Sequence, residues 1–149
     1  METKNNKGLP PAGDEDAISR KILVWLNDFP ESPVALINFE NLAADQESMA
    51  LSTIQSSYIT KRFIYGGYRG EYQFKVIYRI KPGNSNDKRL KADELLNRLG
   101  EWAKVNLPDL GEGITALKVE PSARASVFAA YDNGDEDHQI LLKLSYEVI

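Results

Sequence analysis

Hydrophobic and polar positions alternate most regularly in the segment EYQFKVIYRIK, residues 71–81. A period of two places the two classes of side chain on opposite faces of a β-strand. The preceding SYITKRFIY is typical of a second strand, and the intervening GGYRG contains the glycines that a short turn between twisted strands needs. The pattern therefore predicts a long hairpin over residues 58–81, with one face in contact with solvent.

Two other segments have the period of an amphipathic helix, about 3.6 residues. In DEDAISRKILVWLNDF, one helical face carries Ile18, Ile22, Trp25, Leu26 and Phe29. In the segment from PGNSND to about Val105, the inward positions are Leu95, Leu96, Leu99, Trp102 and Ala103. Short polar side chains at helix starts accept orphan backbone N–H groups. The expected caps are Asp14 or Asp16 for the first helix and Ser85, Asn86 or Asp87 for the second.

The remaining apolar segments are typical of strands. We expect them at residues 34–40, at residues 50–54, and in ITALKVE, SVFAAY and HQILLKLSYEVI. Short connections between these elements favour an α+β fold, with an antiparallel or mixed sheet and both amphipathic helices packed on one face. Residues 14–149 are expected to form this single domain, after a polar, flexible N-terminal arm at residues 1–13.

Composition excludes several classes of function. The chain of 149 residues has no cysteine, so disulfides, thiolate metal sites and cysteine nucleophiles are excluded. No apolar run approaches the roughly 20 residues needed to span a bilayer.

The net charge of −4 is unevenly distributed. Residues 58–81 contain six bases against the single acid Glu71, whereas residues 132–137 contain four acids and no base. These two segments are candidate contact patches between copies of the chain, although a solvated surface also explains them. The candidate interface residues are Arg62, Tyr68, Arg69, Asp135, Glu136 and Asp137.

Signals for catalysis or ligand binding are weak. The single histidine, His138, follows an Asn133-Gly134 pair that predicts a hairpin turn, so we expect it to be structural or solvent-exposed. The surrounding DNGDEDH lacks the carboxylate spacing of a calcium loop, and a solvated acidic turn is expected instead. GYRG, residues 67–70, matches a nucleic-acid-gripping loop that joins helices, but here it is flanked by strands. We therefore predict no enzyme activity, no cofactor and no metal; nucleic-acid contact through the basic hairpin 58–81 is a less favoured alternative.

The connector NLPDLGEG, residues 106–113, is predicted to turn the chain from the second helix into a strand. Pro108 and Gly111 stop the helix, and Gly113 permits the turn. Leu107 and Leu110 are expected to tuck under the helix end, with Asp109 and Glu112 at the rim.

The run NLPDLGEGITALKVE, residues 106–120, resembles the NLP-x-LG-x-G-x-TA-x-K[IV]E stretch of a family of tailed-bacteriophage proteins, described as minor capsid or tail terminator proteins. Other features agree in order: a WL pair at Trp25, an INF strand at residues 37–39, a KR-F-I-x-G segment at residues 61–66 and an EW pair at Glu101. The resemblance covers about residues 16–149. Some members carry a chloramphenicol-resistance label, which fits poorly with a chain whose one histidine lies in an acidic turn.

The resemblance implies a phage or prophage structural protein that caps the tail tube and joins the tail to the head. Its implied partners are further copies of itself in a ring, expected to be a hexamer, together with the tail tube protein and the head connector protein. The implied location is the virion, with assembly in the host cytoplasm, and nucleic acid would at most pass through the ring. Another tail or head-connector component of similar fold remains an alternative.

Overall fold

A computed structural model describes residues 8–54 and 58–149. Within these ranges the chain is α+β, with two helices and a mixed seven-stranded sheet, as the hydrophobic pattern predicts. The elements are α1 Ala12–Leu26, β1 Ile37–Phe39, β2 Ser48–Thr53, β3 Tyr58–Arg62, β4 Tyr68–Ile80, α2 Asn86–Val105, β5 Ile114–Pro121, β6 Ser126–Ala130 and β7 Glu136–Val148. Neither helix is long and apolar enough to cross a membrane.

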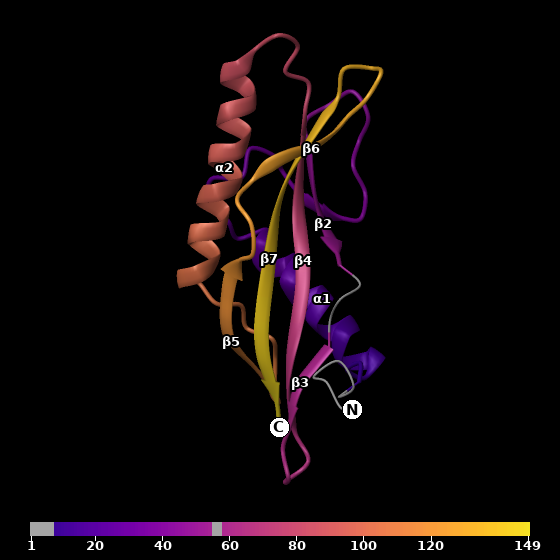
Figure 1. Cartoon of the computed structure of the whole chain (residues 1–149), viewed down its shortest axis with the longest axis vertical. Coiled ribbons are helices and arrows are strands. Elements are labelled where there is room, and N and C mark those ends of the chain that lie inside the picture. The colour runs from indigo at the N-terminus through magenta and orange to yellow at the C-terminus, as the bar shows by residue number, and fades with distance from the viewer. Residues whose placement is uncertain (1–7, 55–57) are drawn as a thin grey trace, which may run out of the picture.

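The two longest strands, β4 and β7, form the centre of the sheet (Figure 1). They pair antiparallel along their whole length, from Tyr68 opposite Val148 to Ile80 opposite Glu136. β2 and β3 pair with opposite ends of β4, and β5 and β6 pair with opposite ends of β7. β1 adds a parallel edge strand beside β2. The central β4–β7 pair is therefore flanked by a shorter strand at each of its four corners, with β1 at the outer edge.

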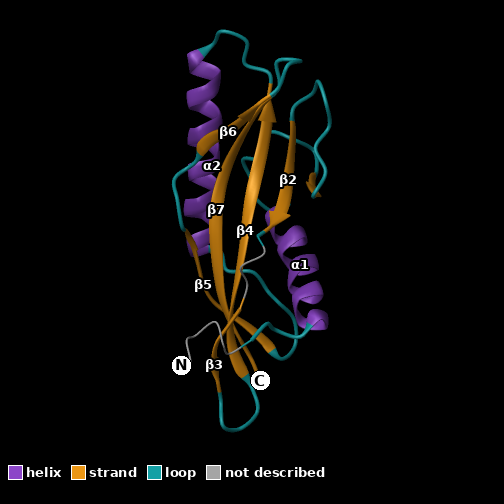
Figure 2. Cartoon of the chain, turned by 45° about the vertical axis from the view of Figure 1, so that its right-hand side comes forward, coloured by secondary structure: helices purple, strands orange, loops and turns teal. Residues whose placement is uncertain are grey.

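Both helices pack on the same face of this sheet. One continuous hydrophobic cluster joins them to the even-numbered side chains of β4 and β7, including Phe74 and Leu142. Trp25 of α1 stacks on Trp102 of α2 with ring centroids 5.1 Å apart, and Trp25 also meets Phe74 edge to face. Figure 2 shows α2 beside the upper half of the long strands and α1 beside their lower half.

The start of α1 differs from the prediction. The helix begins at Ala12, and Pro11 occupies the cap position without a side-chain hydrogen bond. The Pro11 carbonyl accepts from the amides of Asp14 and Glu15, while the Asp14 carboxylate accepts a 2.7 Å hydrogen bond from the Tyr68 hydroxyl. Asp14 therefore ties the helix to β4 and does not cap it. Ser85 does cap α2, where its hydroxyl accepts from Lys88 N.

The prediction of a flexible arm at residues 1–13 is only partly covered by the structure. Residues 1–7 lie outside the described residues, and residues 12–13 belong to α1. Between them, the carbonyl of Gly8 accepts a hydrogen bond from the amide of Ile59, so this part of the arm lies beside β3.

The side chain of Asn27 joins the end of α1 to β1. Its Oδ1 accepts from Ile37 N at 2.8 Å, and its Nδ2 donates to the carbonyls of Ile37 and Leu23 at 3.1 and 2.9 Å. β1 is shorter than the predicted strand 34–40 and pairs with β2 on its other side. Asn27 thus closes the exposed edge of the sheet at Ile37.

The connector 106–113 turns the chain as predicted, with one difference. Gly111 and Gly113 have φ values of 91° and 82°, which only glycine adopts easily. Leu110 is buried, but Leu107 is 44% exposed, so only one of the two leucines packs under the helix. The Trp25 indole donates to the carbonyl of Asn106 at 2.6 Å, which holds the end of α2 against α1.

Candidate functional site

The six candidate interface residues fall at two opposite ends of the β4–β7 pair. Arg62, Tyr68 and Arg69 lie at the end where Tyr68 faces Val148. The second group, Asp135, Glu136 and Asp137, lies at the end where Ile80 faces Glu136. The structure therefore does not bring the six residues together within one chain.

Three of the four acidic residues of the β6–β7 turn are buried and only Asp132 is exposed, which corrects the expectation of a solvated acidic turn for those three. Asp135, Glu136 and Asp137 are 2%, 8% and 1% exposed. Asp137 accepts bonds of 2.7 and 2.9 Å from the Arg79 guanidinium and one of 2.9 Å from the Tyr131 hydroxyl. These carboxylates are oriented by partners within the chain, so they do not form a surface patch for a neighbouring copy.

Glu136 and His138 belong to a buried ionic cluster beneath α2. Glu136 accepts from Arg89 at 3.0 Å and from His138 Nε2 at 2.8 Å, and His138 Nδ1 lies 2.7 Å from an oxygen of Asp93. Burial alone would raise the pKa of Glu136, but the hydrogen bonds from Arg89 and His138 outweigh it and hold that pKa below its ordinary value. His138 is 1% exposed and holds α2 to β7, so of the two expected states, structural or solvent-exposed, it has the structural one.

The basic segment is also partly neutralised within the chain. Arg69 pairs with Glu147 at 2.5 Å, Arg79 with Asp137, and Lys81 with Asp45. The charge that is concentrated along the sequence is therefore balanced by acids brought from other elements. This arrangement removes much of the support for a phosphate-binding surface on residues 58–81.

Tyr68 is buried rather than displayed at a contact surface. It is 7% exposed, and burial together with its hydrogen bond to Asp14 raises its pKa well above the ordinary value. Arg62, by contrast, is exposed at the end of β3. Of the basic-end candidates, Tyr68 thus serves the fold, whereas Arg62 lies at the surface.

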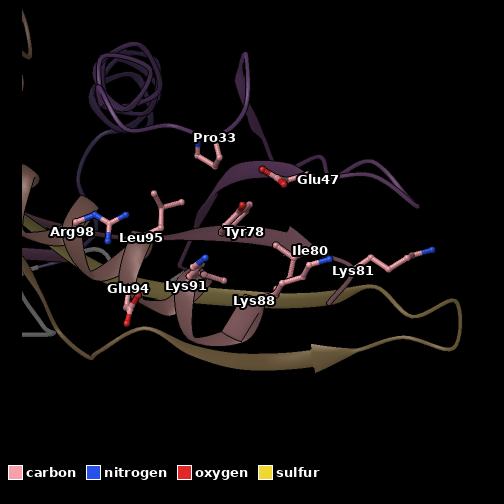
Figure 3. Close-up of a pocket in the computed structure, with 11 residues that line it drawn as sticks. Pro33, Glu47, Tyr78, Ile80, Lys81, Lys88, Lys91, Glu94, Leu95 and Arg98 are labelled. Carbon is pink, nitrogen blue, oxygen red and sulfur yellow. The ribbon is translucent and has the colours of Figure 1, made fainter. Parts of the chain in front are cut away.

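A groove with an apolar floor lies between α2 and the end of β4 (Figure 3). Tyr78, Ile80 and Leu95 line its floor, and its volume is about 520 Å³. Figure 3 shows Pro33 and Glu47 on one side of the groove, with the α2 side chains, including Lys88 and Lys91, on the other. The charged side chains that line the groove belong to lysine, arginine and glutamate residues, so an apolar floor is combined with charges of both signs.

The turn between β3 and β4 carries an exposed apolar surface that the sequence analysis did not single out. β3 ends at Arg62, so Phe63, Ile64 and Tyr65 belong to the turn and not to the strand predicted through SYITKRFIY. Ile64 is 107% exposed and Tyr65 is 76% exposed. In the sequence, the feature that could have indicated this surface is the run of three apolar residues directly before Gly66-Gly67. We call residues 63–67 the hairpin tip.

The hairpin tip is a formed structure. The amide of Phe63 donates to the carbonyl of Gly67 at 2.9 Å, and the amide of Gly66 donates to the carbonyl of Phe63 at 3.1 Å. The rings of Phe63 and Tyr65 stack with centroids 5.1 Å apart. Figure 1 shows the turn projecting beyond the C-terminal end of β7. The tip therefore presents apolar side chains at one extremity of the molecule.

Within residues 8–54 and 58–149, no group of three or more His, Asp or Glu side chains could hold a metal ion. No protein-family model and no curated protein matches the chain.

Proposed function

We propose that the chain is a structural protein of a phage or prophage tail. In this proposal, copies of the chain form a ring, expected to be a hexamer, that caps the tail tube and joins the tail to the head connector. It acts by protein recognition and carries out no reaction. It works in the virion after assembly in the host cytoplasm.

The hairpin tip is the observation that carries this proposal. A large, exposed apolar surface on an isolated protein often marks a site of protein contact. Because the tip projects from the body of the chain, Ile64 and Tyr65 become buried only when another molecule covers them (Figure 1). Its internal hydrogen bonds reduce the ordering cost of such a contact.

The buried ionic groups agree with a role in assembly. Ion pairs among Arg79 of β4, Arg89 and Asp93 of α2, and Glu136, Asp137 and His138 of β7 hold these three elements together. A rigid frame of this kind suits a subunit that must match its neighbours in a ring. The frame also leaves the tip as a separate contact element.

The test is tube capping by the purified chain. Tubes assembled from a phage tail tube protein would be mixed with the chain and viewed by negative-stain electron microscopy. The size of the chain's own assemblies would be followed by light scattering. We expect rings of uniform diameter at tube ends and an arrest of tube elongation. Tubes that elongate at the same rate, with no ring at their ends at any concentration of the chain, would contradict the proposal.

A further inference from the structure

A second surface of the chain complements the hairpin tip. Two adjoining hollows of about 510 and 440 Å³ lie beside α1 and share Asp16, Ser19 and Phe39. Leu9, Glu15 and Tyr72 line the first hollow, and Arg20 and Leu23 line the second. We call the two hollows together the α1 groove.

The α1 groove has exposed apolar side chains and unpaired acids. Leu9 and Phe39 are 77% and 44% exposed. In the described part of the chain, neither Glu15 nor Asp16 forms an ion pair, and Arg20 lies one helical turn further along. Burial and the neighbouring charge of Asp16 raise the pKa of Glu15 above its ordinary value. A cation brought to this site would relieve that repulsion.

The hairpin tip has the opposite charge. Lys61 and Arg62 are exposed directly before Phe63, and the Lys61 amine lies 5.6 Å from the Phe63 ring centroid. The apolar tip with basic flanks is therefore complementary in chemistry to the apolar groove with acidic flanks. Complementary charges of this kind select the partner and fix the orientation of a contact.

The tip cannot fill the groove of its own chain. Tyr72 of β4 lines the groove, and Gly66 lies at the tip. The first residues of β4 connect the two. Four strand steps of about 3.3 Å separate Tyr72 from Tyr68 by roughly 13 Å, and Gly66 lies beyond Tyr68 in the turn. Ile64 and Tyr65 are 107% and 76% exposed, so the described part of their own chain does not cover them and the tip that fills the groove would come from another molecule.

We propose that the hairpin tip of one copy docks into the α1 groove of the next copy. Ile64 and Tyr65 contact Leu9 and Phe39, and Lys61 faces Glu15 and Asp16. The contact uses two different patches, so successive copies join head to tail and close into a ring when the rotation permits. This inference deepens the proposed ring assembly and names the surfaces that form it.

Cysteine cross-linking tests the contact, because the natural chain has no cysteine. Ile64→Cys on the tip and Arg20→Cys in the groove would be prepared as single variants, oxidised alone or mixed, and run on a non-reducing gel. We expect covalent dimers from the mixture, much less from either variant alone, and a ladder of oligomers from the double variant. Equal cross-linking of Ile64→Cys alone would show tip-to-tip contact, and an absence of dimers from the mixture would overturn the inference.

Charge reversal provides an independent measurement by light scattering. Lys61→Glu and Asp16→Lys are each expected to weaken self-association about tenfold or more, and the double variant is expected to recover most of the loss. Ile64→Asp should weaken it similarly, whereas Leu90→Asp, at a 60% exposed position on α2, should leave it unchanged. A double variant that does not regain self-association would contradict the contact, and so would a wild-type chain that is monomeric at every concentration.

The two proposals fail in different ways. Cross-links from the mixture without any binding to tail tubes would leave the tip-to-groove contact standing and remove the tube-capping function. Capped tubes with no cross-link, and with no effect of Ile64→Asp on self-association, would retain the function and overturn the contact. If Ile64→Asp abolished tube binding but left self-association unchanged, the tip would belong to the tube interface. That result would also overturn the inference.

Discussion

Asn27 shows how one side chain can hold two elements in register. Its amide group makes three hydrogen bonds, one back to α1 and two to the edge of β1. Asn27→Ala would leave the amide and carbonyl of Ile37 without these partners. We expect it to lower the free energy of unfolding by about 1–3 kcal/mol in a urea titration. Asn84→Ala, at an exposed turn position, is the control and should change it little; equal losses from both variants would contradict this role.

Glu136 determines part of the response to acid. Its pKa is held below the ordinary value in the folded chain, so its stabilising effect is present above the unfolded pKa of about 4.3 and is lost as the pH falls through the folded pKa. Glu136→Gln should lower the free energy of unfolding at pH 7 by about 2 kcal/mol. Between about pH 4.3 and pH 3 the variant should lose less stability than the wild type. Parallel stability curves for the two proteins over this range would rule out the linkage.

The pairing of β4 with β7 depends on glycine at a position of close approach, Gly70. A Cβ built on Gly70 would lie 2.5 Å from the Tyr146 ring, and Tyr146 is fully buried and cannot move aside. Gly70→Ala should therefore cost about 1–3 kcal/mol of unfolding free energy through overpacking. Gly13→Ala in α1 is the matched control, because a Cβ there meets nothing within 4 Å, and it should stabilise the chain by up to about 1 kcal/mol. Thermal denaturation of both variants checks the contrast; an unchanged melting temperature for Gly70→Ala would contradict it.

The long elements were predictable because their periodicity extends over many residues. β4, β7 and α2 each have a buried face that repeats with the period of the element. β2 was harder to recognise, because Ser48–Leu51 are all buried and show no alternation. The start of α1 was missed because the acids in the first turn resemble caps, whereas Asp14 is drawn to Tyr68 by tertiary packing.

The contact surfaces could be predicted only in part, because charge along a sequence does not show its partners in space. Arg79 and Asp137 are 58 positions apart, yet they face each other across β4 and β7. Pairing of this kind buries the carboxylate of Asp137 and balances much of the basic segment. Ile64 and Tyr65 follow a strand pattern in the sequence, and only the end of β3 at Arg62 places them on a projecting turn.

The hydrophobic core joins both helices and the sheet into one cluster, so the chain should unfold as a single cooperative unit. Trp25 and Trp102 stack at the junction of α1 and α2, above Phe74 of β4. Tryptophan fluorescence therefore reports on this junction, whereas far-ultraviolet circular dichroism reports on the helices and strands together. In urea, at a concentration of the chain low enough to disfavour association, we expect the two signals to change with the same midpoint and slope. A fluorescence transition that precedes the circular dichroism transition would show that the helices separate from the sheet first, and would contradict a single core.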